Sequence, residues 1–202
     1  RQTFEERNQA RDQALMRARA LTRHAAHTIR AIHRSEVEAA ESELREAAAL
    51  VAALKTDLTP YPDLFYAGYT QDAIKEFVEA SVTSALILNR ALPSPADLGV
   101  EEATYMNGLA ESIGELRRRC LDILRQGYST EGERLLACMD EIYAVLVTLD
   151  YPDAITNGLR RQTDVVRGII ERTRADLTLS LREQHLQEAL QKFADKFPGM
   201  TD

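Results

Sequence analysis

Residues 75–81, KEFVEAS, and residues 108–119, GLAESIGELRRR, each carry two glutamates within an otherwise apolar pattern. The members of each pair are three or four positions apart, so on a helix both project from the same side. We therefore interpret both segments as helices, each with an acidic pair set into its apolar face.

The four glutamates are Glu76, Glu79, Glu111 and Glu115. Like charges at these spacings repel one another when exposed, so four together are favoured where a cation lies among them. Hard divalent ions such as Mg2+ take carboxylate oxygens, water and substrate phosphate as ligands. This pattern predicts metal-assisted chemistry on a phosphate ester, with Mg2+ as cofactor or Mn2+ in its place. The alternative is two ordinary amphipathic helices with solvated glutamates.

The remainder of the sequence is also predicted to be helical, with breaks where proline and glycine cluster. Helices are expected at residues 3–34, 35–55, 71–92, 100–126, 130–150 and 153–196. The candidate N-caps are Ser35, which has the spacing of a capping box with Glu38, then Thr70, and Ser129 or Thr130. Because strand patterns and linkers are lacking, we predict an all-α fold. It is a single-domain helical bundle of about six to seven helices over residues 1–202.

Small residues surround both acidic pairs. Gly108 and Gly114 each cost about 1 kcal/mol in a helix relative to alanine, so we expect a packing or functional reason for them. With neighbours such as Ala80, Ser81 and Ser112, they would let two helices approach closely. Such an approach would bring both acidic pairs within reach of one ion.

The net charge of −7 argues against indiscriminate binding of polyanions, since that binding depends on neutralising phosphates. A local basic stripe is still present: Arg19, Arg23, His27, Arg30 and Arg34 follow one another at spacings of four, four, three and four. This is one continuous helix face, and arginine can hold successive backbone phosphates. The alternatives are a solvated face or ion pairs with acids of the next helix.

A second basic group, Arg117 to Arg119, follows directly after Glu115. Three adjacent residues fan around a helix, so at most two share a face. We assign Arg118 to nucleic-acid binding with the stripe of the first helix.

Composition limits location and partners. No stretch approaches the roughly 20 apolar residues of a membrane helix, so no membrane partner is expected. The two cysteines are expected to be buried free thiols, which favours a cytoplasmic protein. An aromatic segment could stack bases or form a buried plug under a loop. Its members are Tyr61, Phe65, Tyr66 and Tyr69.

Several segments resemble the translin family, and more closely translin-associated factor X than translin itself. They are HTIRAIHR (27–34), KEFVEASVTSALI (75–87), YMNGLAESIGELRRRC (105–120) and DAITNGLRRQTDVVRGIIERTRADLT (153–178). The third is the most specific match, and the last resembles the arginine-rich version of archaeal relatives. The resemblance covers nearly the whole chain.

This resemblance implies a bundle of about seven helices, assembled into hollow homo-oligomers, typically octamers, that bind single-stranded RNA and DNA. Translin-associated factor X is the Mg2+-dependent endoribonuclease of the family, and its catalytic acids correspond here to Glu76, Glu79 and Glu111. Glu115 corresponds to a supporting group that we also assign to the metal. The family has aspartate where this chain has Glu111, whose side chain is one methylene longer.

The expected function is a metal-dependent endoribonuclease that cleaves single-stranded or short RNA as a hollow oligomer. A protein of the same architecture that binds single-stranded RNA or DNA without turnover is the first alternative. A structural helical bundle is the second. The acidic residues distinguish the first two functions, and the arginine stripe distinguishes both from the third.

Overall fold

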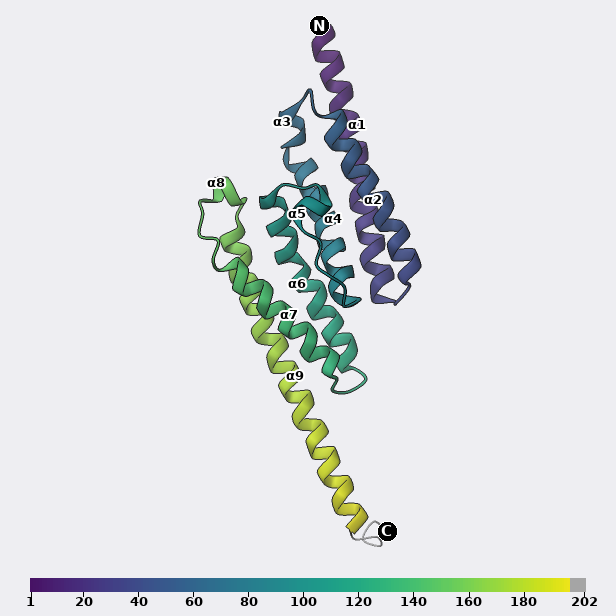
Figure 1. Ribbon diagram of the computed structural model, residues 1–202, viewed down its shortest axis with the longest axis vertical. Coiled ribbons are helices and arrows are strands. Elements are labelled where there is room, and N and C mark those ends of the chain that lie inside the picture. The colour runs from purple at the N-terminus through teal and green to yellow at the C-terminus, as the bar shows by residue number, and fades with distance from the viewer. Residues whose placement is uncertain (197–202) are drawn as a thin grey trace.

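The computed structural model describes residues 1–196 as a bundle of α-helices (Figure 1), with no strand in that range. Its long helices are α1 (Gln2–His33), α2 (Val37–Asp57), α4 (Gly68–Ile87), α6 (Glu102–Leu124), α7 (Thr130–Leu146) and α9 (Leu159–Lys196). Three single-turn helices lie in the connections: α3 (Pro62–Phe65), α5 (Pro95–Leu98) and α8 (Asp153–Thr156). The predicted all-α bundle is confirmed, and the last residues of its expected span, 197–202, lie outside the described residues. No helix in residues 1–196 is both long and apolar enough to cross a membrane.

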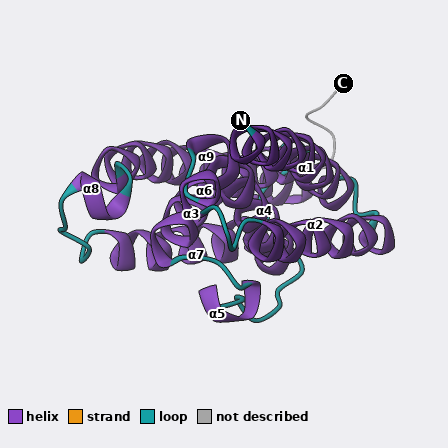
Figure 2. Ribbon diagram, turned by 90° about the horizontal axis from the view of Figure 1, so that it is seen from above, coloured by secondary structure: helices purple, strands orange, loops and turns teal. Residues whose placement is uncertain are grey.

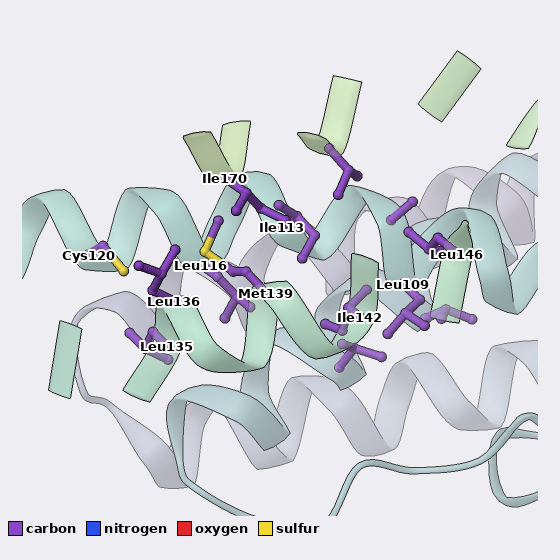
Figure 3. Packing of buried hydrophobic residues seen from close by; sticks show 14 of the residues in the cluster. Leu109, Ile113, Leu116, Cys120, Leu135, Leu136, Met139, Ile142, Leu146 and Ile170 are labelled. Carbon is purple, nitrogen blue, oxygen red and sulfur yellow. The ribbon is translucent and has the colours of Figure 1, made fainter. Parts of the chain in front are cut away.

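The long helices form two groups of three that meet where α4 packs against α6 (Figures 1 and 2). Helices α1, α2 and α4 enclose one core, which includes Leu21, Leu54 and Phe77. Helices α6, α7 and α9 enclose the other, where Leu116 and Met139 lie among the side chains shown in Figure 3. The contact between α4 and α6 is thus the seam between the two halves, and it carries both acidic segments.

Two of the predicted N-caps are wrong. Ser35 has a φ of 61°, in the left-handed region, whereas an N-cap is normally extended; α2 begins two residues later. Thr70 lies inside α4, and its hydroxyl donates a hydrogen bond to the carbonyl oxygen of Leu64 at 2.8 Å. Ser129 is confirmed as a cap, because its side chain accepts a hydrogen bond from the Glu131 backbone N–H at 3.2 Å.

The expected final helix is divided. Asn157 and Gly158 both have positive φ, 53° and 82°, and this turn separates α8 from α9. Helix α9 then runs without a break to Lys196, and its C-terminal half extends beyond the other helices (Figure 1). Leu179 and Leu186 on this half are 64% and 59% exposed. The bundle therefore leaves an apolar part of α9 uncovered.

Cys120 and most of the aromatic segment lie in or against the two cores, whereas Cys138 is only partly buried. Both cysteines are free, and burial raises the pKa of the Cys120 thiol to about 11. Tyr61, Phe65 and Tyr69 pack against the core of α1, α2 and α4, while Tyr66 is exposed. The aromatic segment is therefore mainly a plug for this core.

Gly108 brings α6 unusually close to α4. A β-carbon at position 108 would lie 2.7 Å from the Val78 β-carbon and 2.8 Å from the Lys75 carbonyl oxygen, closer than atoms can approach. Gly114, six residues further along α6, faces open space. The packing reason expected for the two glycines thus exists for Gly108 and is absent for Gly114.

These two glycines give a matched pair of stability variants. Gly108→Ala should lower the free energy of unfolding, because overpacking of about 1–3 kcal/mol exceeds the gain of about 1 kcal/mol in helix propensity. Gly114→Ala should raise it by about 0.5–1 kcal/mol, since the exposed site gains propensity without a clash. Urea denaturation of both variants measures this, and equal effects would contradict the close approach.

Candidate functional site

Three of the predicted glutamates converge at the seam. Glu76 and Glu79 come from α4 and Glu111 from α6, and one carboxylate oxygen of each lies within 4.8 Å of the others. All three side chains are partly buried. We call these residues the acidic trio. Their convergence follows from the helical spacing of each pair and from the close approach at Gly108.

Two donors from outside the trio hold Glu111. The Lys75 ammonium group donates to Glu111 Oε1 at 2.8 Å, and the Gln162 side-chain amide of α9 donates to the same oxygen at 3.1 Å. The Glu111 side chain, which is one methylene longer than aspartate, thus places its carboxylate within hydrogen-bonding distance of two donors. Sequence reasoning missed both donors. Lys75 adjoins Glu76 and could have been noticed, but Gln162 is 51 residues from Glu111 and gives no local signal.

The trio is electrostatically strained. Burial, followed by the charges of Glu76, Glu111 and Glu115, raises the pKa of Glu79 to about 8. Burial and the charge of Glu111 also raise the pKa of Glu76. For Lys75, burial works to lower the pKa, but the hydrogen bond and charge of Glu111 outweigh it, so the pKa is raised. Near neutral pH the carboxylates thus hold a proton at Glu79 when no further cation is present.

Glu115 lies outside the trio. A hydrogen bond of 2.6 Å joins its Oε2 to Nε2 of His33, a side chain only 4% exposed, and this bond lowers the pKa of Glu115. Arg118 Nη1 is 3.5 Å from the same oxygen. Glu115 therefore stays anionic and adds to the negative field at Glu79, but it is not brought among the three converging oxygens. The role of His33 was also missed, since it lies 82 residues away in the sequence.

Most side chains of the arginine stripe on α1 are exposed to solvent and free to contact a ligand. Arg19, Arg23, Arg30 and Arg34 are exposed, and no residue in the described range 1–196 forms an ion pair with them. His27 differs, because its Nδ1 lies 3.5 Å from Oε1 of Glu43 in α2. The alternative of pairing with the next helix thus applies to His27 alone.

The second basic group is divided as its spacing predicts. Arg117 forms an ion pair with Asp176 at 2.9 Å and donates a hydrogen bond to the Thr173 hydroxyl at 3.0 Å, both on α9. Arg119 donates to the backbone carbonyl of His33 at 3.3 Å. Arg118 is the exposed member, and it lies beside Glu115.

The donor set of the trio fits a hard divalent cation. Mg2+ prefers carboxylate oxygens and retains several of its waters, so it needs few protein ligands. A cation among these three part-buried carboxylates would relieve the repulsion that raises the pKa values of Glu76 and Glu79. Glu76, Glu79 and Glu111 are the residues that would hold Mg2+ or Mn2+.

Comparisons with known proteins identify relatives of this chain. No protein-family model matches the sequence. An uncharacterized protein of Methanocaldococcus jannaschii, MJ0175, is 32% identical over 188 residues, covering 92% of this chain and 83% of that protein. The structure of AfC3PO in complex with duplex RNA is similar, with a TM-score of 0.85 and 36% identity. That similarity covers 91% of this chain and 95% of the AfC3PO chain.

AfC3PO is a protein of the translin type, so this likeness in both sequence and structure decides the family. The chain belongs to the translin family. It shares the fold with apo-NeC3PO as well, at a TM-score of 0.82 and 20% identity over 89% of this chain and 94% of that one. Within the translin family the chain is of the translin-associated factor X type.

The raised pKa of Glu79 predicts a pH dependence of stability for this translin-family protein. The folded state holds the Glu79 proton more tightly than the unfolded state, so this contribution is complete below about pH 4.3, the usual pKa of glutamate. It is lost as the pH rises toward about 8. Metal-free wild type should therefore lose melting temperature over that window relative to Glu79→Gln, as measured by thermal denaturation in chelator.

Added Mg2+ should reverse this loss, and its stabilising effect should grow with pH, because a bound cation favours the ionised carboxylate. Glu79→Gln removes the titrating group and serves as the control. Parallel pH profiles for wild type and Glu79→Gln in chelator would contradict the assignment.

Proposed function

We propose that this protein is a metal-dependent endoribonuclease that cleaves single-stranded or short RNA. The observation that carries this proposal is the convergence of Glu76, Glu79 and Glu111 from two helices onto one point. The family relation supports it, since AfC3PO has a solved structure with duplex RNA. The expected departure at position 111 is also accommodated, because Lys75 and Gln162 hold the longer glutamate beside the other two acids.

In this proposal, different residues of the chain hold the metal ion and orient its ligands. A bound Mg2+ would supply an activated water and positive charge for the attacked phosphate. Glu76, Glu79 and Glu111 provide the negative charge that holds the ion, and Gln162 fixes the orientation of Glu111. Partial burial of the trio keeps the local dielectric low, which strengthens each of these interactions.

RNA would be held by the basic residues of α1. Four exposed arginines on one helix face can contact successive phosphates of a single strand. Their exposure and lack of ion pairs within residues 1–196 favour this role over subunit-internal packing. Single-stranded DNA would make the same phosphate contacts. Arg118, which lies on α6 beside Glu115, is the further residue that we assign to nucleic-acid binding.

Binding of RNA without cleavage is the second candidate. Lys75 already neutralises part of the acidic trio through Glu111, so the cluster can persist without a metal ion. In that case the arginine stripe would retain its role and the trio would be structural. Cleavage and binding assays on the same variants separate the two functions.

Cleavage should depend on each member of the trio. Glu76→Gln, Glu79→Gln and Glu111→Gln each keep the side-chain shape but remove the charge that holds Mg2+. We expect each to slow cleavage of labelled single-stranded RNA by about 100-fold or more, in line with the loss of one charge-stabilising group. Affinity for RNA should change little. Assays with Mg2+ and with chelator, and Glu141→Gln on the exposed face of α7 as control, measure this.

Variants of the arginine stripe test RNA binding, as variants of the trio test cleavage. Arg19→Ala, Arg23→Ala and Arg30→Ala together should weaken RNA binding and flatten its salt dependence. The slope should fall by roughly one unit for each phosphate that the variant no longer neutralises, or somewhat less for single strands. Gln variants of the trio that cleave as fast as wild type would refute the nuclease proposal. An unchanged salt slope in the folded triple variant would refute the role of the stripe.

Assembly into a homo-oligomer, most simply the octamer of the family resemblance, is part of this proposal. The C-terminal half of α9 extends beyond the bundle (Figure 1) and exposes Leu179, Leu186 and Leu190 at spacings of seven and four. This spacing forms an apolar stripe suited to packing against another helix. A second copy of the chain would cover it.

Charge on this stripe should disrupt assembly. Wild type should have a mass of several times the chain mass of 22.7 kDa, eight times for an octamer, in size-exclusion chromatography with light scattering. Leu186→Glu with Leu190→Glu should lower that mass, because burying two unpaired charges costs several kcal/mol. Gln187→Glu adds charge on another side of α9 and should leave the mass unchanged. A wild type that runs as a monomer would contradict the proposal.

A further inference from the structure

Lys75 is a fixed cation inside the acidic site. It directly precedes Glu76 on α4, its side chain is only 23% exposed, and its ammonium group lies 2.8 Å from Glu111 Oε1. No other basic side chain within residues 1–196 forms an ion pair with a member of the trio. Lysine is cationic at neutral pH, and the ion pair with Glu111 favours that charged form.

The charges of the site match one divalent ion. Three ionised carboxylates carry three negative charges, and Lys75 supplies one positive charge. One Mg2+ brings the sum to zero, whereas two would leave a net charge of +2 in a part-buried site. Sites that hold two metal ions use both to stabilise the attacking and the leaving oxygens. Here the Lys75 ammonium group, 2.8 Å from Glu111 Oε1, already neutralises one of the three carboxylates.

The hydrogen bonds of Glu111 also support a single divalent ion in the site. Lys75 and Gln162 both donate to Oε1, and an oxygen of a carboxylate has about two lone-pair positions. No residue in the described part of the chain donates to Oε2 of Glu111. Only Oε2 is thus left for an ion, and Glu111 cannot bridge two ions through both oxygens without giving up Lys75 and Gln162.

We propose that Lys75 supplies the second positive charge of the site in place of a second divalent ion, so that each chain binds one ion. This inference rests on the proposed metal-dependent function. In that function Lys75 and the single ion together balance the three carboxylates, and the ion faces the backbone phosphate.

Binding of Mn2+ to the full-length protein tests the inference without relying on cleavage. Isothermal titration and the electron paramagnetic resonance of free Mn2+ should give one ion per wild-type chain. Lys75→Met should bind Mn2+ at least about tenfold more tightly, since a unit charge near 5 Å repels a divalent ion by more than 1 kcal/mol even in water. Lys75→Arg should keep the wild-type stoichiometry and affinity within a few fold. Lys55→Met on α2 is the control, since the Lys55 ammonium group donates to the Gly99 carbonyl oxygen and forms no ion pair within residues 1–196.

Cleavage of RNA provides the second readout. Lys75→Met should lose about 100-fold in rate despite its tighter ion, while Lys75→Arg retains most of the rate. Two ions per wild-type chain would overturn the inference, as would unchanged or weaker Mn2+ binding in Lys75→Met. If no form cleaves RNA, the nuclease proposal fails, but one Mn2+ per chain and tighter binding in Lys75→Met still support the role of Lys75. No Mn2+ binding by wild type would overturn both.

Discussion

The close approach of α6 to α4 at Gly108 is the constraint on which the rest of the site depends. With no side chain at this position, the backbone of α6 lies against Val78 and against the carbonyl group of Lys75. Glu111 follows one turn later on α6 and is thereby carried to the acidic pair of α4. The same seam joins the two halves of the bundle, so the packing that holds the protein together also sets the spacing of its carboxylates. A bulkier residue would push apart both the core and the site.

Convergence of like charges has an energetic cost, and the surrounding structure reduces it in several ways. Lys75 and Gln162 hold one oxygen of Glu111, and His33 holds Glu115 away from the trio. The remaining strain appears as the raised pKa of Glu79, which keeps a proton because its side chain is buried and because Lys75 offsets only part of the repulsion from the neighbouring glutamates. Such a site favours cation binding, because a bound metal ion replaces the proton and relieves the repulsion between the carboxylates. Perturbed carboxylates in a part-buried position are typical of functional sites.

Much of this arrangement could be predicted from local sequence. Apolar periodicity gave the long helices, the acidic pairs gave the trio, and the cost of glycine within a helix pointed to Gly108. What could not be predicted depends on contacts between distant segments. Gln162 and His33 reach their glutamates from other helices, and nothing in their own neighbourhoods shows it. Helix starts were the weakest predictions, because Ser35 is set by a left-handed turn and Thr70 by a hydrogen bond to the preceding turn. Both effects override the preference of serine and threonine for N-caps.

The central claim is that Glu76, Glu79 and Glu111 form a binding site for a divalent cation. Diffraction from crystals grown with Mn2+, recorded at the manganese absorption edge, tests it most directly. We expect one anomalous peak per chain, among the three carboxylates and next to Oε2 of Glu111, with Lys75 still in contact with Oε1. An absent peak at the trio, in crystals where Mn2+ is bound elsewhere on the chain, would contradict it.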